Sequence, residues 1–149
     1  MYRIGMAAFD NCSCLQTIKL PADLWFIDRF AFENCTQLKK IVIPEEVREI
    51  GDNVFAGCTS LSDVTMQSTE LDWVGKDILL DTPFFTDRFV HFPDSVFKIG
   101  ENILRSGVRA SSYAYICCEI ATSDVYLYAV DHDIRFYSCS GAHNGIAQS

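Results

Sequence analysis

A repeat with a spacing of 23 residues runs through the first half of the chain and constrains its fold more than any other feature. Apolar residues and one cysteine recur at this interval in three successive copies. The members of these columns are Ile4, Ile27 and Ile50; Phe9, Phe32 and Phe55; Cys12, Cys35 and Cys58; Leu15, Leu38 and Leu61; Ile18, Ile41 and Val64; and Leu20, Ile43 and Met66. Such periodicity is the signature of a repeat protein, in which each copy forms one structural unit. After one inserted residue a fourth copy begins at Leu71, and its likeness ends after Leu80.

Each copy predicts one coil of a stacked structure. The segment from Leu38 to Ile43 ends in alternating apolar and other residues, which predicts a strand with one buried face that stops at Pro44. The stretch 50–58 carries Asp and Asn where a helix cap would lie and Gly where a short helical segment would end. Such a coil cannot bury its apolar face alone. We therefore expect an α/β repeat solenoid of 23-residue coils, with a ladder of parallel strands along one side.

The repeat also resembles a known family. From Ile4 to Pro21 the chain follows the pattern Ile-Gly-x-x-Ala-Phe-x-x-Cys-x-x-Leu-x-x-Ile-x-Leu-Pro, which is similar to the BspA-like leucine-rich repeat. The resemblance covers about residues 3–80 and implies a short leucine-rich-repeat array. A weaker likeness to about residue 107 rests on Thr82-Pro83-Phe84-Phe85 and on the segment from Val96 to Leu104. Because the family occurs in surface and secreted proteins of bacteria and some protozoan parasites, the resemblance implies adhesion or host interaction.

The last third of the chain predicts strands of a different arrangement. Tyr113–Ile120, Asp124–Val130 and Ile134–Cys139 are rich in aromatic and β-branched residues and are separated by polar turns, which favours an antiparallel meander. A solenoid needs its last coil covered, so we interpret this meander as a β cap. A separate functional module is the alternative. The expected organisation is a leucine-rich-repeat solenoid over 1–80, a degenerate repeat and hairpin over 81–107, and a β cap packed on the solenoid over 108–149.

Composition excludes several classes of function. With 20 acidic against 12 basic residues the net charge is −8, which disfavours nonspecific binding to nucleic acid or anionic lipid. No apolar run approaches the roughly 20 residues that span a bilayer, so we expect no membrane span. Residues 1–15 lack the positive start and apolar stretch of a secretory signal. We expect a cytoplasmic location if the chain is complete, and a cell-surface or secreted one if it is a fragment of a longer protein.

The seven cysteines do not predict a metal site. Cys12, Cys35 and Cys58 share one column, where we interpret them as small apolar residues that fill a tight bend. Cys14 lies outside that column and is expected to be exposed. No cysteine or histidine has a partner at metal-ligand spacing, so we expect no metal and no cofactor.

One enzymatic alternative lies in the C-terminal part. Cys117 or Cys139 with His132 is the candidate pair for a thiol nucleophile and its base, and Asp131 and Asp133 flank His132 as candidate cation ligands. This pattern leaves open a thiol or metal-dependent enzyme within 108–149. Asp and His are also typical of hairpin turns, and we favour that structural interpretation.

Candidate partner-binding residues lie where the repeat leaves the side chain free. Two outward columns alternate with the buried residues of the predicted strands and form either a solvated face or a binding face. These columns are Thr17, Lys40 and Asp63, and Lys19, Val42 and Thr65. Trp25 and Phe26 are anomalous, because their repeat equivalents are the polar Arg48 and Glu49. The two aromatic residues are either interface anchors or packing partners of an element found only in this copy, such as the chain start.

The favoured function is a non-catalytic module that recognises a protein partner through the repeat surface; a homodimer is left open. The alternative is a small acidic intracellular inhibitor of a nuclease or other basic protein, whose carboxylates would imitate phosphates.

Overall fold

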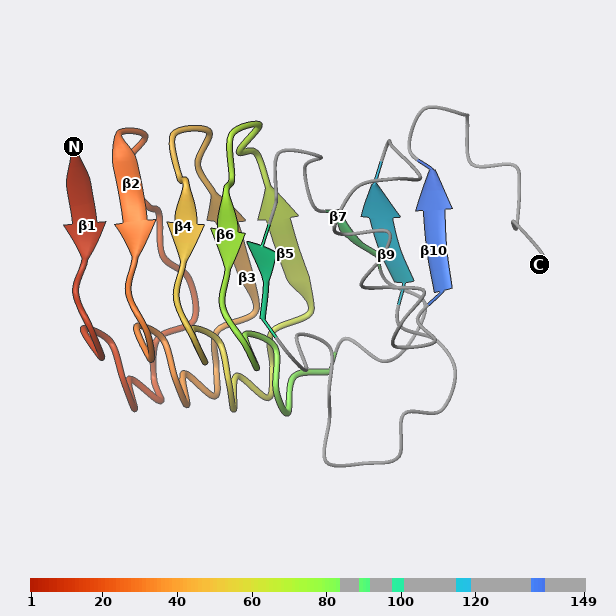
Figure 1. The fold of residues 1–149 in the computed structure, drawn as a ribbon. Helices are drawn as coiled ribbons and strands as arrows, with labels where there is room; N and C mark the ends of the chain where they lie inside the picture. The colour runs from red at the N-terminus through yellow and green to blue at the C-terminus, as the bar shows by residue number, and fades with distance from the viewer. Residues whose placement is uncertain (84–88, 92–97, 101–114, 119–134, 139–149) are drawn as a thin grey trace.

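A computed structural model describes residues 1–83, 89–91, 98–100, 115–118 and 135–138, in which successive coils of the chain stack side by side (Figure 1). We number the coils by the strand that opens each of them: coil 1 is 1–23, coil 2 is 24–46, coil 3 is 47–70, and coil 4 begins at residue 71. The strands are β1 (Tyr2–Ile4), β2 (Leu24–Ile27), β3 (Lys40–Ile43), β4 (Glu49–Ile50), β5 (Asp63–Met66), β6 (Trp73–Val74), β7 (Phe89–His91), β8 (Lys98–Ile99), β9 (Tyr115–Cys118) and β10 (Arg135–Ser138).

Two parallel sheets, not one ladder, run along the stack. The first sheet has the order β1-β2-β4-β6-β8, and its register aligns one column of apolar residues: Ile4, Ile27, Ile50, Val74 and Ile99. The second sheet pairs β3 with β5 in parallel, as the alternating pattern predicted. In coil 1 the second sheet is reduced to a single bridge between Thr17 and Lys40. The parallel solenoid is therefore confirmed, and the first sheet is an addition that the sequence did not reveal.

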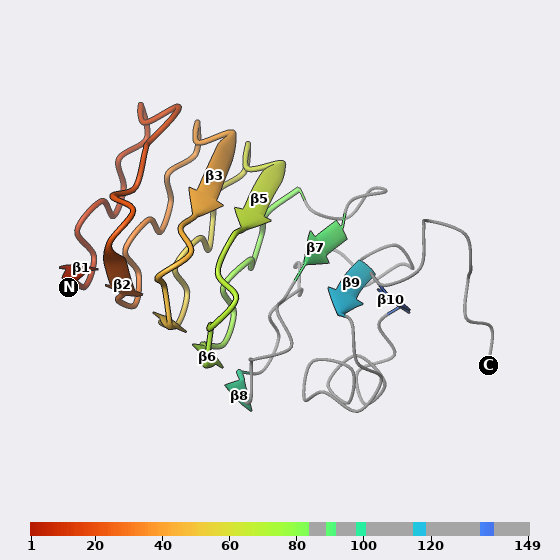
Figure 2. The same cartoon turned by 90° about the horizontal axis from the view of Figure 1, so that it is seen from above.

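The described strands near the C-terminus correct the predicted meander. β9 pairs in parallel with both β7 and β10, and β7 lies beside β5, so these strands prolong the row of the second sheet (Figure 2). Parallel neighbours need a crossover of about a dozen residues or more, and the stretch 119–134 between β9 and β10 provides that length. In the predicted meander these two segments are the first and third strands, with a middle strand between them; their direct pairing shows that no strand lies between β9 and β10, and the antiparallel cap is not confirmed. The expected middle strand, Asp124–Val130, lies outside the described residues, as does most of the hairpin expected within 81–107.

The short helical segments that the sequence predicted are rows of turns instead. No helix occurs among the described residues, and hence none that could cross a membrane. In residues 28–35, the N–H groups of Ala31, Glu33 and Cys35 donate to carbonyls three residues earlier. The N–H groups that alternate with them donate to the next coil, as when Phe32 N–H donates to the Val54 carbonyl at 3.0 Å. We call the segments 5–12, 28–35, 51–58 and 75–82 the turn rows.

Left-handed residues explain why a turn row cannot become a helix. Two positions in each row, four residues apart, have a positive φ, which breaks a right-handed helix after one turn. The first position holds Ala7, Phe30, Asn53 and Asp77, and the second holds Asn11, Asn34, Gly57 and Asp81. Asn, Asp and Gly tolerate this conformation best, so the second column was the signal in the sequence that indicated turns.

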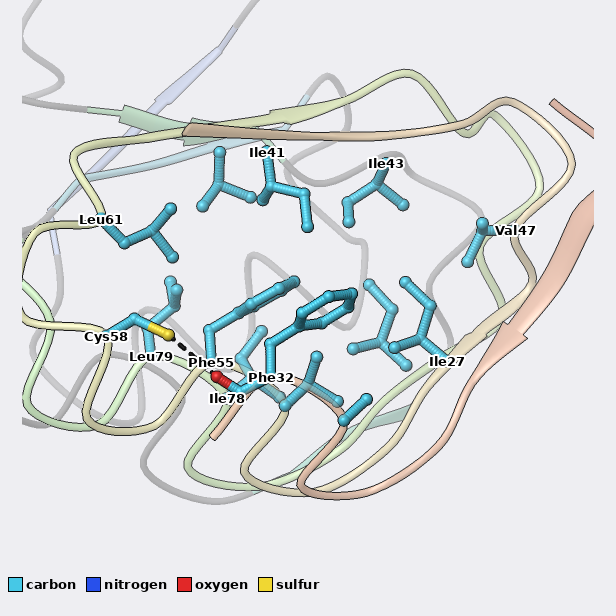
Figure 3. Packing of buried hydrophobic residues seen from close by; sticks show 14 of the residues in the cluster. Ile27, Phe32, Ile41, Ile43, Val47, Phe55, Cys58, Leu61, Ile78 and Leu79 are labelled. Carbon is cyan, nitrogen blue, oxygen red and sulfur yellow. Dashed lines mark hydrogen bonds between the residues drawn. The ribbon is translucent and has the colours of Figure 1, made fainter. Parts of the chain in front are cut away.

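Stacked phenylalanines form the centre of the core between the two sheets (Figure 3). The ring centroids of Phe9 and Phe32 are 5.0 Å apart and those of Phe32 and Phe55 are 5.7 Å apart, with nearly parallel planes. Phe32 and Phe55 are fully buried, whereas Phe9 in coil 1 is half-buried. The columns of the repeat are therefore columns of the core.

The cysteine column lies at the bend after each turn row. The thiol of Cys35 donates to the Phe9 carbonyl and that of Cys58 to the Phe32 carbonyl, each at 3.1 Å. Burial raises the pKa of Cys35 to about 11 and that of Cys58 to about 12. Cys12 is exposed because no described coil precedes it. The interpretation as small buried residues is thus confirmed for two of the three cysteines.

Glycine is required in coils 3 and 4 where the first sheet turns into the turn row, a position that Asp28 occupies in coil 2. A Cβ added to Gly51 would lie 2.5 Å from the backbone nitrogen of Arg29 in coil 2, and one added to Gly75 would lie 2.4 Å from the Gly51 carbonyl carbon. A Cβ on Gly5 would meet nothing within 4 Å. The backbones of neighbouring coils therefore approach closely at this column, except at the start of the stack.

We predict that Phe32→Ala lowers the free energy of unfolding by about 3–5 kcal/mol, because it removes a buried ring that stacks on both neighbours. Urea denaturation followed by circular dichroism measures the loss. A loss below about 1 kcal/mol would contradict the central place of this ring in the core.

Gly51→Ala should lower the free energy of unfolding by about 1–3 kcal/mol, because the added methyl group forces two backbones apart. Gly5→Ala is the matched control and should change stability by less than about 0.5 kcal/mol. Equal losses in the two variants would show that the close approach at Gly51 is not what makes glycine necessary there.

Cysteine labelling should follow position in the stack. At pH 8, iodoacetamide should modify Cys12 and Cys14, which are exposed, and spare Cys35 and Cys58, whose raised pKa values leave little thiolate. Peptide mass spectrometry before and after unfolding measures the modification at each site. If Cys58 reacted in the folded protein as fast as Cys14, the packing described for the bend would be wrong.

Candidate functional site

The outer face of β2 carries the two aromatic residues that the sequence singled out. Leu24 and Ile27 at its ends are buried in the core, whereas Trp25 and Phe26 between them are both half-buried. A shift of register between β1 and β2, at Tyr2 and Arg3, accompanies this pattern. Two adjacent large side chains are thus partly exposed on one strand.

Phe26 is packed against the chain start. In the first sheet it is registered between Arg3 on β1 and Glu49 on β4. The Arg3 guanidinium carbon lies 5.4 Å from the centroid of the Phe26 ring, and Arg3 Nη2 donates to Asp28 Oδ2 at 2.6 Å. The Arg3 cation thus lies over the Phe26 ring, and the Asp28 carboxylate holds this cation in place. Packing against the chain start was one of the two interpretations of Phe26 that the sequence left open.

Trp25 lies between two hollows of the surface. The larger hollow has a volume of about 880 Å³ and the smaller one about 330 Å³. The larger is lined by Met1, Ile18, Lys19, Leu20, Ala22, Asp23, Trp25, Val42, Pro44, Glu45, Glu46, Arg48 and Gln67. The smaller is lined by Met1, Tyr2, Arg3, Trp25, Phe26 and Glu49. We call the larger one the Trp25 hollow.

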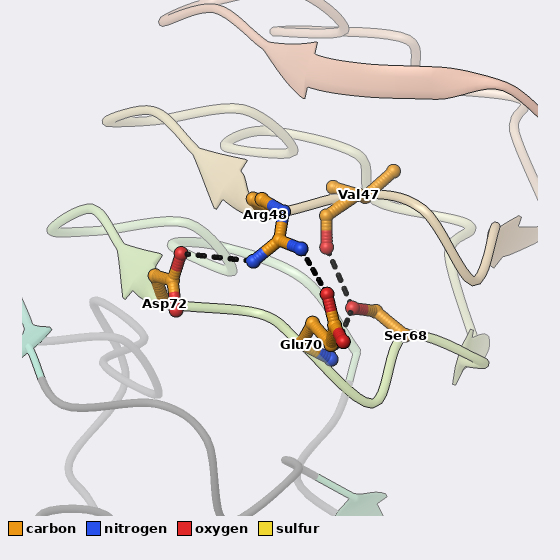
Figure 4. Close-up of polar contacts among 5 residues, drawn as sticks. All are labelled: Val47, Arg48, Ser68, Glu70 and Asp72. Carbon is orange, nitrogen blue, oxygen red and sulfur yellow. Dashed lines mark hydrogen bonds and ion pairs between the residues drawn. The ribbon is translucent and has the colours of Figure 1, made fainter.

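Arg48 takes the place of Trp25 in the next coil and is held by acids of coils 3 and 4 (Figure 4). Its guanidinium pairs with the Glu70 carboxylate, and its Nη1 lies 3.7 Å from Asp72 Oδ2. Ser68 Oγ donates to the Val47 carbonyl at 2.6 Å and accepts from the Glu70 N–H at 3.3 Å, which fixes the loop that carries Glu70. The charge of Arg48, at one side of the Trp25 hollow, is therefore already balanced.

The remaining charges around the Trp25 hollow are mostly acidic. Asp23, Glu45 and Glu46 are exposed and form no ion pair with another residue that the structure describes. Lys19 is likewise exposed and unpaired within the described part of the chain. Since Arg48 is balanced, the side chains around the hollow carry a surplus of negative charge.

Some residues of the predicted outward columns line the Trp25 hollow, and the others lie on the outer side of the second sheet. Lys19 and Val42 line the Trp25 hollow together with Trp25. The others line neither hollow and are exposed on the outer side of the second sheet; they are Thr17, Lys40, Asp63 and Thr65. In that sheet Lys40 is registered with Asp63 and Val42 with Thr65. Two residues of one outward column, Lys19 and Val42, thus lie at the same hollow as Trp25.

The described residues include neither a group of metal ligands nor both members of the thiol and base pair that the sequence left open. Within the described ranges, no three His, Cys, Asp or Glu side chains lie close enough together to hold a metal ion. Glu33, whose pKa is raised by burial and by the like charge of Asp10, lies in a turn row and lines neither hollow. Of the residues proposed for a thiol or metal-dependent enzyme, Cys117 lies on β9, and 131–133 and Cys139 are outside the described residues.

Sequence reasoning missed the residues that surround the aromatic pair. Arg3, Glu45, Glu46 and Arg48 were not singled out, and neither was Trp73, which shares a column with Phe26 and Glu49. The signal for Trp73 was its place in the fourth copy, 24 residues after Glu49 with one residue inserted. No signal indicated the hollow, because coils 1, 2 and 3 all contribute to it.

Comparisons with known proteins agree with this architecture. The sequence model of a family described as BspA type Leucine rich repeat region (6 copies) matches residues 1–108. Among solved structures, the chain is similar to a leucine rich cell surface protein from Faecalibacterium prausnitzii A2-165, with a TM-score of 0.63 and 31% sequence identity. The match covers 76% of this chain and 29% of that one, so this chain spans less than a third of that protein's length. Comparison with curated proteins gives no match.

Proposed function

This chain belongs to the BspA type leucine-rich repeat family, and on that premise we propose that it is a non-catalytic module that binds a protein partner through the outer face of β2. One observation carries the proposal: Trp25 and Phe26 lie partly exposed beside two hollows, at positions where the next coil has Arg48 and Glu49. Polar residues satisfy the fold at these positions. Folding of the coil therefore does not require aromatic side chains at these two positions.

The composition of this face suits protein recognition. Trp, Tyr and Arg are the residues that contribute most to binding energy at interfaces, and the aromatic ones bury a large area at low cost in conformational entropy. The face combines Trp25 and Phe26 with Tyr2, which is 61% exposed, and with Arg3 and Arg48. By contrast, the outer side of the second sheet has charged and hydroxyl side chains, which contribute little at an exposed rim.

The similar protein of solved structure is described as a cell surface protein, and this supports a partner met at a cell surface. Adhesion or host interaction is the role that we propose for the module in that setting. The description of that relative as a cell surface protein supports this role. The geometry of the Trp25 hollow supports binding through the outer face of β2.

We predict that the double substitution Trp25→Ser and Phe26→Ser weakens binding of the partner at least about 30-fold, because loss of an aromatic anchor costs about 2 kcal/mol or more. The partner is first isolated from host extract on immobilised protein and identified by mass spectrometry. Its affinity for purified variants is then measured by biolayer interferometry.

The matched control is the double substitution Lys40→Ser and Asp63→Ser on the outer side of the second sheet. It should leave the affinity within about threefold, because exposed charges at an interface rim are worth under about 1 kcal/mol. Both variants should retain the circular dichroism spectrum of the parent. Binding that survives loss of both aromatic residues, or that disappears in the control, would refute the proposed face.

A further inference from the structure

We infer that the Trp25 hollow receives a basic segment of the partner, with an arginine or lysine side chain lying over the Trp25 ring and paired with the acidic rim. The inference rests on the proposed function and adds the chemistry of the partner to it. Three observations carry it: the apolar lining, the unpaired carboxylates, and a cation already held in the same way on the neighbouring strand.

The hollow has the apolar lining that an inserted side chain needs. Next to Trp25, its wall includes Ile18, Leu20, Val42 and Pro44. Leu20 and Pro44 are buried, whereas Val42 is 41% exposed, more than most valines of a folded domain. The aliphatic stem of an arginine or lysine would cover this surface while its charged head stayed at the rim.

The charges at the rim of the hollow determine which charge the bound segment of the partner carries. Asp23, Glu45 and Glu46 have no cationic partner among the described residues, and Arg48 is balanced by Glu70 and Asp72. The unbalanced positive groups among the residues that line the hollow are Lys19 and the amino group of Met1, against the three carboxylates. An incoming cation gains three carboxylates at the rim of the hollow, and an incoming carboxylate would be repelled.

The first sheet already holds one cation in this manner. Arg3 lies over the ring of Phe26 and is fixed by Asp28. At Trp25 the aromatic ring and the carboxylates are present, but no cation of a described residue is recorded over the ring. The partner is therefore expected to supply it, because a cation over an aromatic face is stabilised most when the pair is removed from water.

The test uses the fluorescence of Trp25. The chain has two tryptophans, so Trp73→Phe leaves Trp25 as the single fluorophore. Three blocked pentapeptides serve as probes: leucine alternates with arginine, with citrulline, or with glutamate. Citrulline keeps nearly the size and shape of arginine, but a carbonyl oxygen replaces one NH2 group and the positive charge is lost.

We expect the arginine peptide to change Trp25 fluorescence at low salt, and to bind at least about tenfold more tightly than the citrulline peptide. The glutamate peptide should not bind. Raising the salt to about 0.5 M should weaken binding of the arginine peptide, because exposed parts of the ion pairs are screened.

Neutralising the rim supplies the second arm. In the Trp73→Phe background, Glu45→Gln with Glu46→Gln should weaken the arginine peptide about tenfold. The control removes the same charge elsewhere, by Asp63→Asn with Asp77→Asn, and should leave the affinity unchanged. Asparagine tolerates the positive φ of residue 77, so the control should keep its fold.

Several results would overturn the inference. These are equal binding of the arginine and citrulline peptides, absence of any binding, loss of binding in the control alone, and calorimetric binding without a change in Trp25 fluorescence.

The natural partner separates this inference from the proposed function. If its affinity depends on Trp25 and Phe26 but not on Glu45, Glu46 or salt, the proposed function stands and the basic segment is wrong. If its affinity does not depend on the aromatic pair, the proposed function itself fails.

Discussion

Backbone hydrogen bonds between coils are the interaction on which the rest of the structure depends. Each turn row leaves every second N–H without a partner in its own coil, and these groups find carbonyls only in the next coil, as Asn34 does at 2.8 Å from the Ala56 carbonyl. An unpaired buried N–H is costly, so a coil is stable only within a stack. The same spacing brings the phenylalanines into contact and aligns the strands of both sheets. Packing and pairing therefore enforce one register.

The repeat made the solenoid predictable because its columns are set by burial. Phe32, Ile41 and Ile43 occupy the core as their spacing indicated, and the strand that precedes Pro44 lies where alternation placed it. The turn rows were misjudged because Asp and Asn favour both helix caps and left-handed turns, and only hydrogen bonds to another coil decide between them. The first sheet escaped prediction because its strands do not alternate: β2 is buried at both ends and half-buried between them, whereas β3, of the same length, alternates exposed and buried residues. The direct pairing of β9 with β10 could not be foreseen, since which strands become neighbours depends on the path of the chain between them.

The candidate site was only half visible for a related reason. Trp25 and Phe26 differ from the repeat and could be found by comparison of copies. Their surroundings could not, because Val42 and Arg48 meet Trp25 only after coils 2 and 3 stack. A repeat protein thus separates two tasks: columns that never vary build the stack, and a few substituted outward positions give one coil its own chemistry. At the Trp25 hollow that substitution is combined with a shift of register between β1 and β2.

The direction of the hydrogen bonds in the turn rows gives the stack an electrical polarity. In all three interfaces between coils 1 and 4, these N–H groups point toward the following coil and the accepting carbonyls point back. Their peptide dipoles therefore add along the stack, as they do in a helix, but with the opposite sense relative to the chain. The carbonyl oxygens of Met6, Ala8 and Asp10 form the negative end and accept no hydrogen bond from a described residue. Beside the two sheets the N–H groups point the other way, as when Gly51 N–H donates to the Ile27 carbonyl at 2.8 Å. The polarity therefore belongs to the turn-row side of the stack, where these carbonyls attract donors and cations and repel carboxylates.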